Sequence, residues 1–202
     1  MKLSSPERVS TPIFLHYPPI ALLAFLLITA PAVSQEQPLT GKILKEFVGT
    51  GESAMHMPTA VAVTPDGRVY VADGANARIL RFAVEGGPPD VIQAIGEQQL
   101  IAPMGLAADS QGRLYIADPG RHDVLIMSPD GSLDRSLVPQ TAGEDRSADV
   151  TGVAASPDGK VVWLSDNDNH RLIRYDLLRN TQTAAGRFGE SAGQLHHPFL
   201  IA

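Results

Sequence analysis

The chain has 202 residues, of which 44% are hydrophobic and 5% aromatic, and its formal net charge is −6. This size and composition suit a globular protein of one domain that can bury its own core. The acidic balance, with no basic stretch interleaved with aromatic residues, argues against nucleic acid as a partner. The absence of cysteine excludes thiolate zinc sites, disulfides and cysteine nucleophiles.

The first 34 residues have the layout of a targeting segment. Lys2 and Arg8 precede the uninterrupted apolar run 20–30, and small residues follow it at Ala32 and Ser34. This pattern predicts a secretory signal peptide over residues 1–34 that is cut near Ser34. Residues 35–40, "QEQPLT", then form a short linker.

An uncleaved N-terminal membrane anchor is the alternative, because apolar residues extend back to Ile13. Pro18 and Pro19 shorten that run below the roughly 20 residues that a membrane span needs. We therefore expect a secreted or periplasmic protein with no membrane span after signal cleavage.

The strongest signal is an internal repeat, seen in "PTAVAVTPDGRVYVADGANARILRF" (58–82), "PMGLAADSQGRLYIADPGRHDVLIM" (103–127) and "VTGVAASPDGKVVWLSDNDNHRLIRY" (150–175). The turn glycines Gly67, Gly112 and Gly159 set a period of 45 and then 47 residues. Each copy has an apolar run, a turn, a β-rich run ending in Asp, a short polar loop and another β-rich run. A looser segment between copies supplies a fourth strand.

Four short strands in each period of 40–50 residues are typical of a β-propeller blade. The fold prediction is all-β: a β-propeller of four-stranded blades over residues 41–202, with about three and a half blades present and the ring incomplete. The repeats span about 58–102, 103–149 and 150–197, and the next begins at 198. A helical repeat is excluded because Pro-Asp-Gly ends a helix and "RVYVAD" alternates with period two.

The repeat resembles the NHL repeat, a propeller blade of secreted proteins, through the string P-x-x-[VLI]-A-x-x-x-x-G-x-[VL]-[YW]-[VIL]-[AS]-D-x-x-N-H-R-[IL]-x-R-[FY]. The third copy is the best match, with Asp166, Asn169, His170 and Arg171. The first copy has Ala77 in place of the histidine, and the second copy is degenerate. The resemblance covers about residues 43–202 and implies the six-bladed type, but the fold hosts many functions.

In such a blade, the loop after the second strand and the segment entering the first strand open on one face. The predicted ligand or partner face therefore carries the Asp-x-x-Asn-His-Arg loops, namely Asp73, Asn76, Arg78, Asp118, Arg121, His122, Asp166, Asp168, Asn169, His170 and Arg171. The "PDG" turns lie on the opposite face, where turn chemistry explains them.

The loop "DNDNHR" has two interpretations. As a calcium loop it fails, because Arg171 and Leu177 stand where an EF-type loop needs Gly and Glu. As a hairpin it is consistent, with Asp166 accepting hydrogen bonds from the turn and Arg171 pairing with Asp166 or with a neighbouring blade. We expect mainly the hairpin role, with contact between His170 and a partner as the alternative.

Two further groups of residues could form sites. In the second copy Asp123 replaces the arginine and Arg121 lies two positions earlier, which indicates either a compensated swap or a loop freed to bind a ligand. His56, His196 and His197 precede first strands and would bind a metal only if they converged, so no metal site is predicted. No Gly-x-Ser-x-Gly elbow or P-loop is present.

Three copies do not close a ring, since six blades at this period need roughly 270 residues. The interpretations are a fragment of a longer protein, two chains that pair into one ring, or an open arc. In the first of these, "GKILKEFV" (41–48) would be an outermost strand that awaits a last blade.

These observations predict an exported propeller scaffold that binds a protein or carbohydrate partner and needs no cofactor. The alternative is a propeller enzyme, either a gluconolactonase-like hydrolase using a divalent cation or a lyase resembling the peptide-amidating propellers. The lactonase motif Glu-x-Pro occurs only in the linker, as "EQP" at 36–38. The sequence leaves open whether the chain is catalytic.

Overall fold

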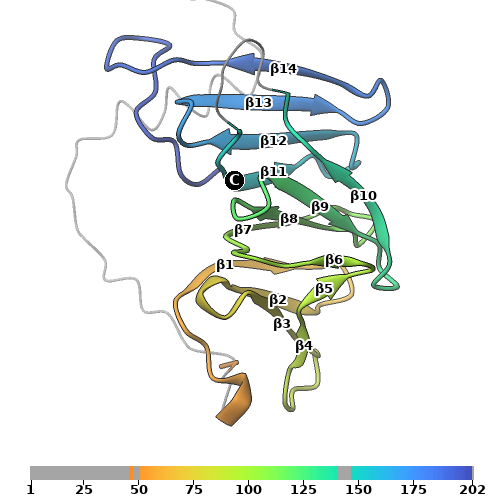
Figure 1. Ribbon diagram of the computed structural model, residues 1–202. Coiled ribbons are helices and arrows are strands. Elements are labelled where there is room, and N and C mark those ends of the chain that lie inside the picture. The colour runs from red at the N-terminus through yellow and green to blue at the C-terminus, as the bar shows by residue number, and fades with distance from the viewer. Residues whose placement is uncertain (1–45, 48–50, 141–146, 202) are drawn as a thin grey trace, which may run out of the picture. The chain divides into compact units, whose positions relative to one another are not determined.

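The computed structural model describes residues 46–47, 51–140 and 147–201, and these form three four-stranded antiparallel sheets (Figure 1). The first sheet contains β1 (Pro58–Val63), β2 (Val69–Asp73), β3 (Arg78–Phe82) and β4 (Asp90–Ile92). The second contains β7 (Gly105–Ala108), β8 (Leu114–Asp118), β9 (Asp123–Met127) and β10 (Leu133–Leu137). The third contains β11 (Val150–Ala155), β12 (Val161–Asp166), β13 (Arg171–Asp176) and β14 (Thr181–Ala185).

Each sheet is a propeller blade whose strands pair in chain order, and we call these sheets blades 1, 2 and 3. A short hairpin of β5 (Ala94–Ile95) and β6 (Gln98–Gln99) connects blades 1 and 2. Single 3₁₀ turns occupy Gly51–Ser53 and Gly74–Asn76. The predicted all-β propeller of four-stranded blades is confirmed, and the blades described do not close a ring.

The turn between the first two strands is built alike in every blade. Gly67, Gly112 and Gly159 have φ of 83°, 82° and 63°, a region that side chains disfavour. Each glycine N–H donates to the carbonyl three residues earlier, on Thr64, Asp109 and Ser156 respectively. The repeated glycine is therefore a requirement of the turn. The extra residue of the third copy lengthens β12 to six residues, against five in β2 and β8.

The blades pack through their faces, and their first strands β1, β7 and β11 lie next to one another. Between blades 1 and 2 the core contains Tyr70, Ile79, Leu114 and Ile116. Between blades 2 and 3 it contains Tyr115, Ala117, Leu164 and Ile173, with others. Successive β8 residues point into alternate cores, so the whole of this strand is buried.

The first strands of blades 2 and 3 approach closely. A Cβ added to Gly105 of β7 would lie 2.9 Å from the Thr151 carbonyl oxygen and 3.0 Å from Gly152 Cα. Both neighbours are backbone atoms, which have little freedom to move aside. Glycine at this position therefore sets the spacing of the two blades.

Several predictions fall wholly or partly on residues outside the described range. These are the signal peptide, the linker, the membrane anchor and most of the 41–48 strand. Phe47 is described, and its ring lies 5.3 Å from that of Phe82 in β3. Among the residues that the structure describes, no helix is long and apolar enough to cross a membrane.

Candidate functional site

The predicted hairpin role of the Asp…Asn…Arg loops is confirmed in blade 1. Asp73 is fully buried, and its Oδ2 accepts hydrogen bonds from Arg78 Nε at 2.8 Å and Asn76 Nδ2 at 2.9 Å. The other guanidinium nitrogens of Arg78 donate to the carbonyls of Glu52 and Ala54. Burial acts to raise the pKa of Asp73, but these donors and the His56 N–H outweigh it and hold the pKa below its ordinary value.

Blade 3 repeats this arrangement in the loop between β12 and β13. Arg171 Nε donates to Asp166 Oδ2 at 2.8 Å, and Asn169 Nδ2 donates to the same carboxylate at 3.0 Å. Asp166 is fully buried, so its carboxylate is bonded within the blade and is not available to a ligand in solvent. The calcium interpretation therefore has no support from the contacts of Asp166.

The same aspartates tie each blade to the segment that enters it. Asp73 accepts the His56 N–H at 2.7 Å, Asp118 accepts the Ile101 and Ala102 N–H groups, and Asp166 accepts the Asp149 N–H at 3.0 Å. The hairpin loops and the entering segments therefore lie on one face, as the repeat predicted. We call this face the hairpin face.

Blade 2 shows the compensated swap that the sequence allowed. Arg121 forms two hydrogen bonds with the Asp123 carboxylate, both at 3.0 Å, and its Nη1 donates to the Gln99 carbonyl at 3.0 Å. In blade 1, Arg78 binds the carbonyls of the entering segment in the same manner. Arg121 therefore replaces the missing loop arginine, and Asp123 supplies its carboxylate.

One loop position adopts a left-handed backbone in all three blades. Ala77, His122 and His170 have φ of 50°, 62° and 52°, and each stands four residues after the strand-ending aspartate. Alanine is strained in this region. The residue at this motif position therefore has a structural role in the turn, whether or not its side chain binds anything.

A cluster of four rings, three of them exposed and that of His170 half-buried, lies on the hairpin face of blade 3. The His170 ring centroid is 4.4 Å from that of His197, 6.1 Å from His196 and 4.8 Å from Phe188. His197 donates its N–H to His170 Nδ1 at 3.2 Å. We call His170, Phe188, His196 and His197 the ring cluster.

The ring cluster differs from the histidine grouping considered in the sequence. His196 and His197 lie beside His170, whereas His56 lies in the segment that enters blade 1, where its backbone N–H donates to Asp73. The sequence does not show that His170 is their neighbour, because this proximity arises only when the loop after β14 folds back. A β-bridge between Phe188 and Leu195 holds that loop. Within the described ranges, no group of three or more His, Cys, Asp or Glu is arranged to hold a metal ion.

Acidic side chains adjoin His122 between blades 2 and 3. His122 is exposed, and its Nδ1 lies 3.1 Å from the Ala148 carbonyl oxygen. Burial raises the pKa of Asp149, and the nearby charges of Asp168 and Asp166 raise it further. His122 and Asp168 are both exposed in this region.

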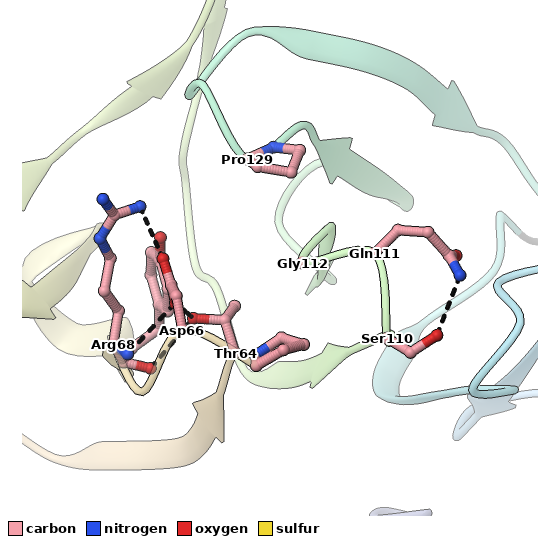
Figure 2. Close-up of a pocket in the computed structure, with 9 residues that line it drawn as sticks. Thr64, Asp66, Arg68, Ser110, Gln111, Gly112 and Pro129 are labelled. Atoms are coloured by element: carbon pink, nitrogen blue, oxygen red, sulfur yellow. Dashed lines mark hydrogen bonds and ion pairs between the residues drawn. The ribbon is translucent and has the colours of Figure 1, made fainter.

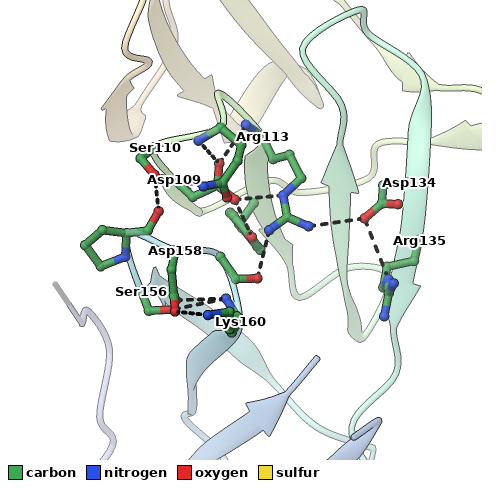
Figure 3. Close-up of polar contacts among 12 residues, drawn as sticks. Asp109, Ser110, Arg113, Asp134, Arg135, Ser156, Asp158 and Lys160 are labelled. Atoms are coloured by element: carbon green, nitrogen blue, oxygen red, sulfur yellow. Dashed lines mark hydrogen bonds and ion pairs between the residues drawn. The ribbon is translucent and has the colours of Figure 1, made fainter. Parts of the chain in front are cut away.

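On the opposite face, a buried polar network centred on Asp109 joins blades 2 and 3 (Figure 3). Asp109 Oδ2 accepts from Arg113 Nε at 2.7 Å and from the Tyr115 hydroxyl at 2.8 Å. Arg113 Nη2 donates to the Gly159 carbonyl of blade 3 at 2.8 Å. Asp109, Arg113 and Tyr115 match no functional motif in the sequence, because the turn alone accounts for their surroundings.

The fold and these loops define the chain as an all-β propeller protein. Over residues 48–143, slightly under half of its length, the chain matches a family described as "SMP-30/Gluconolactonase/LRE-like region". The NHL assignment stays a resemblance, because the family that matches is a different propeller family. No curated protein matches the sequence.

Solved structures confirm the propeller fold. A streptogramin B lyase structure is 14% identical with a TM-score of 0.55, and the alignment covers 71% of this chain and 44% of that one. Virginiamycin B lyase from Staphylococcus aureus is 14% identical with a TM-score of 0.53 and the same coverage. Hydrazine synthase from Kuenenia stuttgartiensis is 15% identical with a TM-score of 0.53 and coverages of 79% and 42%. The chain thus spans less than half the length of these proteins.

Proposed function

We propose that the chain is an exported β-propeller module that binds a protein or carbohydrate partner on its hairpin face. Residues 1–34 act as the signal peptide in this proposal, and the module works outside the cytoplasm. The ring cluster is the observation that carries the proposal, because it gathers four rings on the hairpin face with centroids 4.4–6.1 Å apart.

The loop residues divide into two classes by exposure. Asp73, Asp118 and Asp166 are fully buried and bound within their blades, so they shape the loops without reaching a partner. Asp168 and His122 are exposed at the loop tips, and Phe188 is 60% exposed. Exposed rings next to polar groups offer apolar faces to sugar C–H groups or to apolar side chains, with hydrogen bonds at the rim.

An oligosaccharide array tests carbohydrate binding, and affinity capture from extracellular proteins tests protein binding. We expect Phe188→Ala and His196→Ala to lower the affinity for the captured ligand at least about tenfold, as for an interface hot spot. Lys160→Ala, at an exposed turn on the opposite face, is the matched control and should leave the affinity unchanged. Equal binding by Phe188→Ala and the unmodified protein would contradict the proposal.

A second candidate function is a propeller enzyme, which is favoured by the match to a family whose description includes gluconolactonase. A lactonase of that kind would need a divalent cation, and the residues described do not form a group that fits one. Elemental analysis of the purified chain, followed by lactone hydrolysis with and without chelator, separates the two functions. A stoichiometric metal together with chelator-sensitive hydrolysis would replace the scaffold proposal.

A further inference from the structure

Blades 1 and 2 use equivalent turn positions differently, and the difference leaves a cavity. In blade 2 the residues that open, close and follow the turn are Asp109, Arg113 and Tyr115. Asp109 is 3% exposed and accepts four hydrogen bonds: from the Gln111 and Arg113 N–H groups, Arg113 Nε and the Tyr115 hydroxyl. Its carboxylate thereby holds Arg113 in the junction with blade 3.

The equivalent residues of blade 1 are Thr64, Arg68 and Tyr70, so the arginine and tyrosine are kept while a hydroxyl replaces the buried carboxylate, and the carboxylate of this turn belongs to Asp66. Thr64 Oγ1 donates to Asp66 Oδ1. Arg68 pairs with Asp66 Oδ2 at 3.0 Å, where the two side chains are 44% and 50% exposed. Arg68 therefore lies at the surface, while its counterpart Arg113 enters the next junction.

A cavity of about 200 Å³ occupies the junction of blades 1 and 2 in consequence (Figure 2). Thr64, Asp66, Arg68 and Tyr70 are among the residues that line it from blade 1, and Gly112 and Pro129 are among those that line it from blade 2. A Cβ added to Gly112 would meet only Pro129, at 3.5 Å, whereas one added to Gly159 would clash with Arg113 and Asp109. The space that Arg113 fills beside blade 3 is thus open beside blade 2.

The geometry points to a binding site for a small organic carboxylate in this cavity. The ligand's carboxylate takes the role that the Asp109 carboxylate has in blade 2 and accepts hydrogen bonds from the Arg68 guanidinium and the Tyr70 hydroxyl, while the Thr64 hydroxyl stays bonded to Asp66. Arg68 can turn inward because its present bond to Asp66 is exposed and therefore weak. A guanidinium and a hydroxyl converging on one anion are a strong donor set.

Two features indicate the size and polarity of the ligand. The cavity is smaller than the 300–1,000 Å³ typical of sites for drug-sized molecules, so a short-chain acid fits best. A second cavity of about 450 Å³ shares Arg68 and Pro129 and is also lined by Arg81 and Asp90. A polar tail on the acid, such as a hydroxyl group, would extend toward it.

The test is a titration of the full chain with sodium acetate, monitored by amide NMR and compared with sodium chloride at equal ionic strength. We expect saturable shifts at residues 64–70 and 110–112 with acetate and none with chloride, at roughly millimolar concentrations for a few charged hydrogen bonds. The absence of saturable shifts at these residues would overturn the proposal.

Thr64→Asp is the decisive variant, because it supplies the carboxylate that Asp109 supplies in blade 2. We expect it to abolish the acetate response. Ser156→Asp adds the same group at the equivalent turn of blade 3 and should leave the response intact. Tyr70→Phe, which removes one donor, should weaken acetate binding at least about threefold and serves as a second test if Thr64→Asp fails to fold. An unchanged response in folded Thr64→Asp would refute the site.

Discussion

The two blade junctions have the same backbone plan and opposite interiors. Between blades 2 and 3, Asp109 and Arg113 fill the junction with hydrogen bonds that reach Gly159. Between blades 1 and 2, threonine at the position of Asp109 leaves Arg68 at the surface and a cavity inside. The position of the turn's carboxylate thus separates a junction filled by hydrogen bonds from one that contains a cavity.

The largest expected effect comes from opening the closed junction. Asp109→Ala removes the acceptor of four hydrogen bonds and breaks the short ion pair of Arg113 at a largely buried position, so that the guanidinium keeps only the longer pair with Asp134, at 3.7 Å, and its bond to the Gly159 carbonyl. Breaking a buried ion pair typically costs about 3–5 kcal/mol, so the free energy of unfolding in urea should fall by that amount. Thr64→Ala, at the equivalent position of the open junction, should cost about 1 kcal/mol. Equal losses in the two variants would mean that the junctions do not differ energetically.

Two buried tyrosines between blades 2 and 3, Tyr115 and Tyr175, predict a loss of stability in alkali. Burial raises the pKa of Tyr175 to about 12, above the value of about 10 in an unfolded chain. In the folded state Tyr175 therefore keeps its hydroxyl proton to higher pH. The stability that this difference provides is fully present below about pH 10 and is lost as the pH rises toward 12. Burial, followed by the hydrogen bond to Asp109, also raises the pKa of Tyr115.

Tyr175→Phe isolates this effect. Between about pH 10 and 12 the unmodified protein should lose roughly 2 kcal/mol more of its free energy of unfolding than the variant does. Urea denaturation at several pH values measures the difference. Parallel curves for the two proteins would show that Tyr175 titrates normally. At neutral pH the variant should lose about 1 kcal/mol, because the Tyr175 hydroxyl donates to the Val138 carbonyl.

The spacing of blades 2 and 3 gives a third way to perturb only one junction. Gly105→Ala places a methyl group against the Thr151 and Gly152 backbone, and such overpacking costs about 1–3 kcal/mol. Chemical denaturation measures the loss. Ala60 stands at the equivalent position of blade 1, and Ala60→Gly should cost no more than about 1 kcal/mol. A stability of Gly105→Ala equal to that of the unmodified protein would show that the two blades can separate at no cost.

The smallest expected effect is stabilising and lies outside both junctions. Ala77→Gly removes the strain of an alanine side chain at a left-handed position of the β2–β3 loop, with φ 50° and ψ 46°. We expect a gain of about 1 kcal/mol and a higher Tm in calorimetry. Ala75→Gly, two residues earlier in the same loop, is the control and should lower the Tm slightly. A lower Tm for Ala77→Gly would show that the loop relaxes to another conformation.

Much of the fold could be predicted from the sequence, because the repeat carries it. The turn glycines and the alternating runs around "RVYVAD" placed the first three strands of each blade, and the strand-ending aspartates indicated the hairpin face. The complete burial of β8 was less evident, since alternation suggests one buried face and one exposed face. Blade 2 is covered on both sides, so both sets of β8 side chains are buried.

The candidate sites were harder to predict because they depend on distances between blades. His170 and His197 are 27 residues apart, and only the fold-back after β14 brings their rings together. The cavity has a signal in the sequence, which is Thr64 aligned with Asp109 and Ser156. That difference acquires meaning only once the Arg113 guanidinium is seen to reach the Gly159 carbonyl.

The bond between each strand-ending aspartate and its entering segment also bears on folding order. These contacts join residues only 16 or 17 positions apart, as with His56 and Asp73. Short loops close quickly and at low entropic cost, whereas a ring closes through its most distant residues. Each blade can therefore form the hydrogen bond between its aspartate and its entering segment before the next blade has been synthesised. The chain can thus acquire structure one blade at a time from its N-terminal side.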